Sequence, residues 1–191
     1  WETNPLHGDI RDLTFAMEQD SDETPGLLNV AAKFEDLGWS PMGAIPGMSG
    51  LNGAVQATER GGWWTAGGEA VAFRDPELFA QPWPAGALES ELRWERKGED
   101  WQFTAPRIGI RHPDLKVQGS LAMVWRPGQR PLMDLQAAFQ DGNAAVLDRY
   151  LPRRHLPPAT ASWLKASVRD GRIHDGQLVL RGDLGRFPFR D

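Results

Sequence analysis

Apolar and polar residues alternate along most of the chain. The clearest case is LKVQGSLAMVW, residues 115–125, in which the apolar residues from Leu115 to Trp125 fall on every second position. Successive side chains of a strand point to opposite faces of a sheet, so this stretch predicts one long strand with an apolar side and a mostly polar side. The same period of two recurs at residues 10–18, 26–34, 50–55, 87–95, 100–106, 133–140 and 176–184.

Short turn signals separate these predicted strands. Glycine-rich or Pro-Gly segments lie at residues 60–62, 66–68, 96–100, 126–131 and 169–177. Connections this short favour antiparallel neighbours, because parallel strands need long crossovers. The pattern therefore predicts a mainly β fold built from antiparallel strands.

Helical segments are few. Residues 75–80 predict a single turn with Asp75 as N-cap. Residues 157–171 predict the one regular helix, with Trp163 and its apolar neighbours Leu164 and Val168 on one side. Residues 143–152 predict a further short helix.

Composition narrows the class of protein. The chain has 191 residues, 21 glycines, 15 prolines, nine tryptophans, one tyrosine and no cysteine. Disulfides and thiolate metal sites are therefore excluded, and no apolar run approaches the ~20 residues of a membrane-spanning helix. The net charge of −5 argues against nucleic acid, whose phosphates require clustered Lys and Arg. Because the chain begins at Trp1 without an initiator Met, we expect an excised or processed segment.

Catalytic patterns are missing from the sequence. The four histidines, at positions 7, 112, 155 and 174, lack the spacing that places two metal ligands on one helix face. The glycines at 47, 50 and 53 spell neither a nucleophile elbow nor a dinucleotide-binding loop. Isolated histidines are usually surface residues. We therefore expect no enzyme activity, no catalytic residue, no metal and no cofactor.

The apolar sides of the strands are the main candidates for function. They could form a closed protein core, a flat tryptophan platform for carbohydrate, or a groove for lipid, and the composition does not separate these three.

Several segments together resemble the periplasmic region of the bacterial YhdP-type proteins, in the AsmA-like group that also includes TamB. A specific combination is YLP at 150–152, a helix containing Trp163 and Leu164, a G-x-L-x-L-x-G-D-L run, and FPF at 187–189. The other matching pieces are FEDLGWSPMGAIPGMSGLNGAV at 34–55, DPELF at 75–79, LRWERKGEDWQF at 92–103 and DLQAAFQDGN at 134–143.

The resemblance implies an extended, strongly curved antiparallel sheet, groove-like, with one or two short helices. A β-sandwich is the alternative. It also implies that residues 1–191 are one continuous segment of a larger periplasmic region, in a parent protein anchored at the bacterial inner membrane. The implied function is transport of phospholipid between the inner and outer membranes. The implied partners are phospholipid acyl chains, neighbouring segments of the same parent chain, and the membrane through the parent's anchor.

The predicted groove residues belong to the alternating stretches between residues 92 and 139. They are Leu92, Trp94, Trp101, Phe103, Leu115, Val117, Leu121, Met123, Trp125, Leu135 and Phe139. The alternative function is a structural or interaction module of the cell envelope in which the same residues form a closed β core. A groove predicts an exposed apolar trough larger than the few hundred Å² usual on a soluble monomer, whereas a closed module does not.

Overall fold

The computed structural model describes residues 6–18, 27–42, 46–76, 79, 82–150, 158–167 and 170–183. Strands dominate this part of the chain. They are β1 His7–Glu18, β2 Leu27–Trp39, β3 Gly47–Thr58, β4 Gly61–Arg74, β5 Trp83–Lys97, β6 Asp100–His112, β7 Leu115–Trp125, β8 Leu132–Asn143 and β9 Arg172–Asp183. A 3₁₀ helix, η1, covers Ala144–Arg149, and an α-helix, α1, covers Pro158–Ser167.

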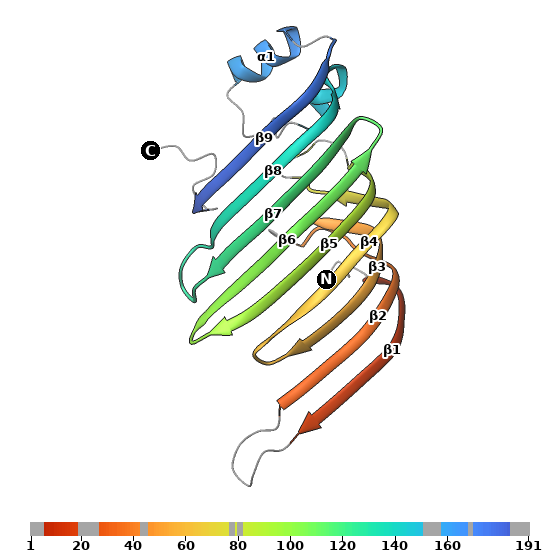
Figure 1. Cartoon of the computed structure of the whole chain (residues 1–191), viewed down its shortest axis with the longest axis vertical. Coiled ribbons are helices and arrows are strands. Elements are labelled where there is room, and N and C mark those ends of the chain that lie inside the picture. The colour runs from red at the N-terminus through yellow and green to blue at the C-terminus, as the bar shows by residue number, and fades with distance from the viewer. Residues whose placement is uncertain are drawn as a thin grey trace.

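All nine described strands form one sheet in the order β1 to β9, so that each strand pairs with its neighbours along the chain (Figure 1). Every pair is antiparallel. The sheet is open and curved, which confirms the predicted fold class. The β-sandwich alternative is wrong for the described residues, because they contain no second sheet to pack against the first.

The predicted turns near residues 60–62 and 96–100 each join two strands into a hairpin, whereas residues 66–68 and residues 172–177 of the predicted turn at 169–177 lie inside strands β4 and β9. The hairpin β3–β4 turns at residues 59–60 and the hairpin β5–β6 turns at residues 98–99. The glycines at 67 and 68, expected in a turn, lie inside β4. A Cβ on Gly67 would lie 2.7 Å from the carbonyl oxygen of Leu88 on the neighbouring strand. Glycine here permits close approach of two backbones rather than a change of direction.

The helical predictions hold in part. Residues 143–152 contain η1, and residues 157–171 contain α1. Figure 1 places α1 beyond the end of the sheet at which β9 begins. Trp163, which the sequence places on the apolar side of this helix, is 62% exposed. The side chains of Leu164 and Val168 lie outside the described residues, as do residues 77, 78 and 80 of the predicted turn.

Bulges bend the sheet, and register shifts mark every strand pair from β1–β2 to β6–β7, including those near its β1 end. The pairing register shifts within β1–β2, β2–β3 and β3–β4. Asp12, Asp36 and Gly50 lie at these shifts with φ angles of 52°, 49° and 77°. Aspartate and glycine tolerate this left-handed conformation better than other residues, and a bulge bends its strand and increases the local twist.

The bend closes the sheet on itself over β2, β3 and β4. Phe34, Leu51, Ala66 and Val71 form a buried cluster there, with Leu51 at 0% exposure. The ring of Trp64 lies 6.3 Å, centroid to centroid, from the ring of Phe34. A single-layer sheet therefore has a small closed core where its curvature brings side chains of one face together.

Candidate functional site: an apolar face across nine strands

Directly paired residues of neighbouring antiparallel strands share a face of the sheet. Following the pairing from β1 to β9 gives a row that is apolar at every position except Ser90, whose hydroxyl donates to the carbonyl oxygen of Ala66 at 3.1 Å. The row is Ile10, Phe34, Gly53, Ala66, Ser90, Ile108, Gly119, Ala137 and Leu178.

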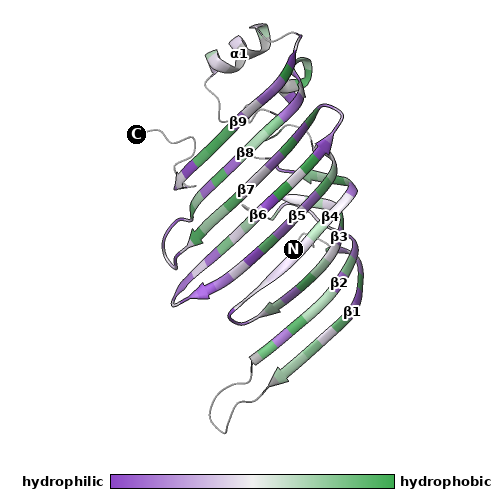
Figure 2. Ribbon diagram, in the orientation of Figure 1, coloured by the Kyte–Doolittle hydropathy of each residue, from purple (hydrophilic) through white to green (hydrophobic). Residues whose placement is uncertain are grey.

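A second row on the same face contains no polar side chain. It consists of Phe15, Val30, Ala57, Gly62, Trp94, Phe103, Met123, Met133 and Gly182. We call the side of the sheet that carries these two rows the apolar face. Figure 2 shows the alternation of hydrophobic and hydrophilic residues along the strands from which this face arises.

The opposite side, which we call the polar face, carries charged and polar side chains that face solvent. One of its rows is Thr14, Ala31, Gln56, Trp63, Arg93, Thr104, Ala122, Asp134 and Arg181. Arg181 and Asp134 pair across β8–β9 at 2.7 Å. Exposed pairs of this kind add little stability, so they identify the solvated side rather than hold the sheet together.

All eleven predicted groove residues lie on the apolar face. Leu92 pairs with Trp64, Trp101 pairs with Trp125, and Val117 pairs with Phe139. Trp94, Phe103 and Met123 belong to the second row. The remaining predicted residues, Leu115, Leu121 and Leu135, are separated from these by an even number of positions along their strands and therefore lie on the same face. None of the eleven is fully buried, and Trp125 is 42% exposed. The eleven residues therefore share one face of the sheet, while their role in contacting lipid stays a prediction.

The apolar face is open over β6–β9. A groove of about 450 Å³ lies there, floored by side chains such as Ile110, Val117, Leu135 and Phe139. Leu178 of β9 also lines it and is 43% exposed. Over β2–β4, by contrast, the same face is closed by the buried cluster. The face thus has a packed part and an exposed part.

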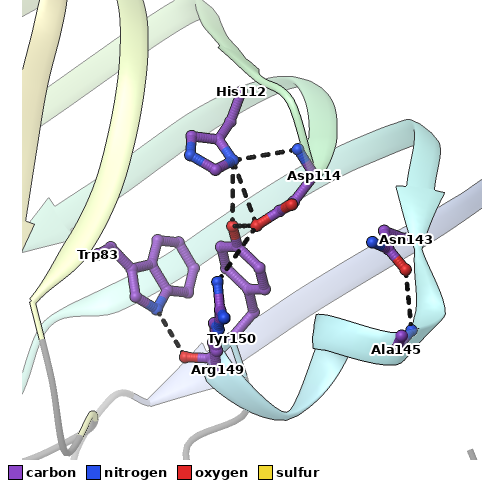
Figure 3. Close-up of polar contacts among 7 residues, drawn as sticks. All are labelled: Trp83, His112, Asp114, Asn143, Ala145, Arg149 and Tyr150. Carbon is purple, nitrogen blue, oxygen red and sulfur yellow. Dashed lines mark hydrogen bonds and ion pairs between the residues drawn. The ribbon is translucent and has the colours of Figure 1, made fainter. Parts of the chain in front are cut away.

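A short segment follows the ends of the strands at one side of the groove. We call Asn143–Tyr150, which contains η1, the rim segment. It leaves the end of β8 and reaches the start of β5, where the indole Nε1–H of Trp83 donates to the carbonyl oxygen of Arg149 at 3.2 Å (Figure 3). The rings of Trp83 and Tyr150 lie 5.1 Å apart, edge to face. Trp83, Asn143 and Tyr150 all line the groove.

A compact polar cluster joins the rim segment to the β6–β7 turn. The Tyr150 hydroxyl donates to Oδ2 of Asp114 at 2.9 Å. The backbone N–H of Asp114 donates to Nδ1 of His112 at 3.1 Å (Figure 3). The same ring nitrogen lies 3.5 Å from Oδ2 of Asp114 and 3.3 Å from the Tyr150 hydroxyl.

The environment of Tyr150 changes its acidity. Partial burial, and then the hydrogen bond to the Asp114 carboxylate and its negative charge, raise the pKa of Tyr150 to about 12, while the Arg149 guanidinium acts in the opposite direction. The phenol therefore remains a hydrogen-bond donor at any physiological pH.

Sequence reasoning missed this cluster. His112 was expected to be an isolated surface histidine, but its side chain is 16% exposed and touches both Asp114 and Tyr150. His112 and Asp114 lie at the β6–β7 turn and Tyr150 follows η1, and the alternation of apolar and polar residues does not reveal such positions. The available signal was that Tyr150 is the single tyrosine in a chain with nine tryptophans.

Other site types are not visible in the part of the chain that the structure describes. There, no group of three or more His, Asp or Glu side chains is placed to hold a metal ion. Among the same residues, no helix combines the length and apolar character needed to cross a membrane.

Comparison with known proteins gives one family. The family model described as "YhdP protein" matches residues 1–191. Neither the curated proteins nor the solved structures include a significant match to the chain. The family is one of the bacterial envelope and suggests a periplasmic protein related to lipid transport. Since the match extends over the whole sequence, the chain belongs to the YhdP protein family.

Proposed function

We propose that the protein is a non-enzymatic segment of a hydrophobic conduit that moves phospholipid through the periplasm, between the inner and outer membranes, in a parent chain anchored at the inner membrane. The observation that carries the proposal is the apolar face, which extends across the nine described strands with Ser90 as the one polar side chain of its two rows, and which is open over β6–β9.

The chemistry of the apolar face suits acyl chains. Each methylene removed from water contributes about 0.8 kcal/mol, so a long chain gains substantial affinity without any polar contact. An extended peptide would instead bury its backbone N–H and C=O groups against a floor of side chains such as Val117, Leu135 and Phe139, which offer no hydrogen bond, and this costs free energy. The apolar floor of the groove also does not discriminate between head groups, as a conduit for mixed phospholipids requires.

The two edges of the sheet suit continuation by neighbouring segments of the same parent chain. Within the described residues, β1 and β9 each pair on one side alone. Phe15 and Met17 of β1 are exposed on the apolar face at 65% and 76%. An uncovered edge of this kind readily accepts a further strand. Added strands would extend both the sheet and its apolar face. The proposal involves no nucleic acid, in line with the net charge of −5.

A structural or interaction module of the cell envelope is the second candidate. The observation in its favour is the closed cluster around Leu51 and Val71, which shows that part of the apolar face packs on itself. In this case the open part over β6–β9 would be covered by a protein partner rather than by lipid.

The test is native mass spectrometry of the protein purified from a bacterial host, followed by organic extraction of bound molecules. We expect phospholipid or fatty acid on the wild type and none on the double variant Leu121→Asp, Trp125→Asp, because an alkyl chain on the apolar face would remove the new carboxylates from water at a high cost in free energy. The matched control is Gln118→Asp with Ala122→Asp, on the polar face of the same strand, which should keep the lipid.

Folding of each variant is checked by circular dichroism. A wild type that carries no lipid, and takes up none from phospholipid vesicles, would contradict the conduit and favour the closed module. Lipid retained equally by both double variants would place the binding site elsewhere.

A further inference from the structure

The rim segment is attached differently at its two ends. At the β8 end, backbone bonds hold it: the Asn143 N–H donates to the Asp114 carbonyl oxygen at 2.8 Å, and the Ala144 N–H donates to the Gly171 carbonyl oxygen at 2.9 Å. At the far end, side chains hold it, through the Tyr150 hydroxyl on Asp114 and the Trp83 indole on the Arg149 carbonyl. The segment is therefore anchored by backbone at one end and fastened by two side-chain hydrogen bonds at the other.

These two hydrogen bonds lie beside the open groove. Tyr150, Trp83 and Asp114 all line it, and the Asp114 side chain is 17% exposed. Moving Tyr150 away from Asp114 would widen this side of the groove without disturbing the pairing of β6 to β9. The bond from a hydroxyl to a carboxylate is charge-assisted and stronger than a neutral one, so it can keep the segment closed for most of the time.

We propose that Tyr150 and Trp83 form a latch on the rim segment, and that release of this latch is the step that lets an alkyl chain enter or leave the β6–β9 groove from the side. The proposal rests on the proposed function, since it assumes that the groove takes an alkyl chain. It adds a lateral route of access and the two positioning residues that control it.

A latch and a residue that merely contacts the ligand affect the association and dissociation rates differently. If opening precedes both entry and exit, then weakening the latch raises the association and dissociation rates by the same factor and leaves Kd unchanged. If Tyr150 merely contacts the ligand, its loss raises the dissociation rate alone and weakens Kd by that factor.

The test is stopped-flow binding of a long-chain fatty acid with a fluorescent label. Tyr150→Phe keeps the ring against Trp83 but loses the hydroxyl, and Trp83→Phe loses the indole donor. We expect both rates to rise about tenfold in Tyr150→Phe, equivalent to ~1.4 kcal/mol, with an unchanged Kd, and to rise also in Trp83→Phe. The matched control is Trp63→Phe, which loses an indole bond to Gln56 on the polar face and should keep the wild-type rates.

A second measurement needs no ligand. The indole N–H of Trp83 should exchange with solvent faster in Tyr150→Phe than in the wild type, as followed by NMR, while that of Trp63 should not change. Unchanged binding rates in both latch variants, or a faster dissociation with a matching loss of affinity, would overturn the latch. A wild type that binds no fatty acid or vesicle phospholipid, but shows the faster Trp83 exchange, would instead overturn the proposed function and leave a latch that serves another ligand. If Tyr150→Phe does not fold, Trp83→Phe decides.

Discussion

Two leucines on the same face should respond very differently to truncation. Leu51 is 0% exposed and belongs to the cluster that closes the face over β2–β4, whereas Leu178 is 43% exposed at the open groove. Leu→Ala at a well-packed core site costs about 2.7–5 kcal/mol, because a cavity adds to the lost transfer free energy. Full burial of a leucine side chain contributes about 1.5–3 kcal/mol. With nearly half of its surface already in water and no cavity to leave, Leu178→Ala should cost about 1 kcal/mol.

The assay is urea denaturation of the two alanine variants, followed by circular dichroism and by tryptophan fluorescence. Coincident transitions and an unchanged m value are required before the free energies of unfolding are compared. We expect Leu51→Ala to lose at least ~2 kcal/mol more than Leu178→Ala. For a domain of this size, each kcal/mol lowers the melting temperature by about 2–4 °C. Equal losses at the two sites would refute the reasoning, because they would mean that the face over β6–β9 is packed shut in solution.

Other predictions follow from single sites. Tyr150 is the one tyrosine, so ultraviolet absorbance of the phenolate reports it directly, and it should ionise near pH 12 rather than near 10. The unfolded chain loses the phenol proton at a lower pH than the folded chain does, so the free energy of unfolding should fall as the pH rises from 10 to 12. Below pH 10 the contribution of Tyr150 is complete. In urea titrations, Tyr150→Phe should lack this part of the pH dependence. Gly50→Ala, at φ +77°, would place a Cβ 2.7 Å from the carbonyl oxygen of Ala70, whereas Gly98→Ala, at φ +65°, meets no atom within 4 Å. Thermal denaturation should show a loss of ~1 kcal/mol from backbone strain at Gly98 and roughly twice that at Gly50; equal losses would mean that the contact at Gly50 relaxes freely.

The strands could be predicted from the sequence because one face of the sheet is apolar. A shift by one residue would move every side chain of a strand to the other face, so the alternation from Leu115 to Trp125 must match the strand. It does, since β7 covers these same residues. The turns expected at residues 66–68 and 172–177 were wrong, because glycine also occurs inside strands, as at Gly67, where it permits close approach of two backbones.

Whether the apolar face is covered could not be read from the alternation. Leu51 and Leu121 are both apolar positions of an alternating strand pattern, yet Leu51 is fully buried and Leu121 only partly. The difference comes from the bend at the bulges around Asp12 and Asp36, which depends on backbone geometry across several strands. The latch was hidden for a related reason, because its groups meet only after the sheet has formed.

Photo-crosslinking along β7 tests the central claim most directly. A photoreactive amino acid is placed at each position from 116 to 123 in turn, the protein is mixed with phospholipid vesicles or recovered from bacteria, and lipid adducts are detected by mass spectrometry. We predict adducts at positions 117, 121 and 123, on the apolar face, and none at 116, 118, 120 and 122. Adducts without this period of two, or adducts confined to the polar face, would contradict the account of the apolar face as a lipid-binding surface.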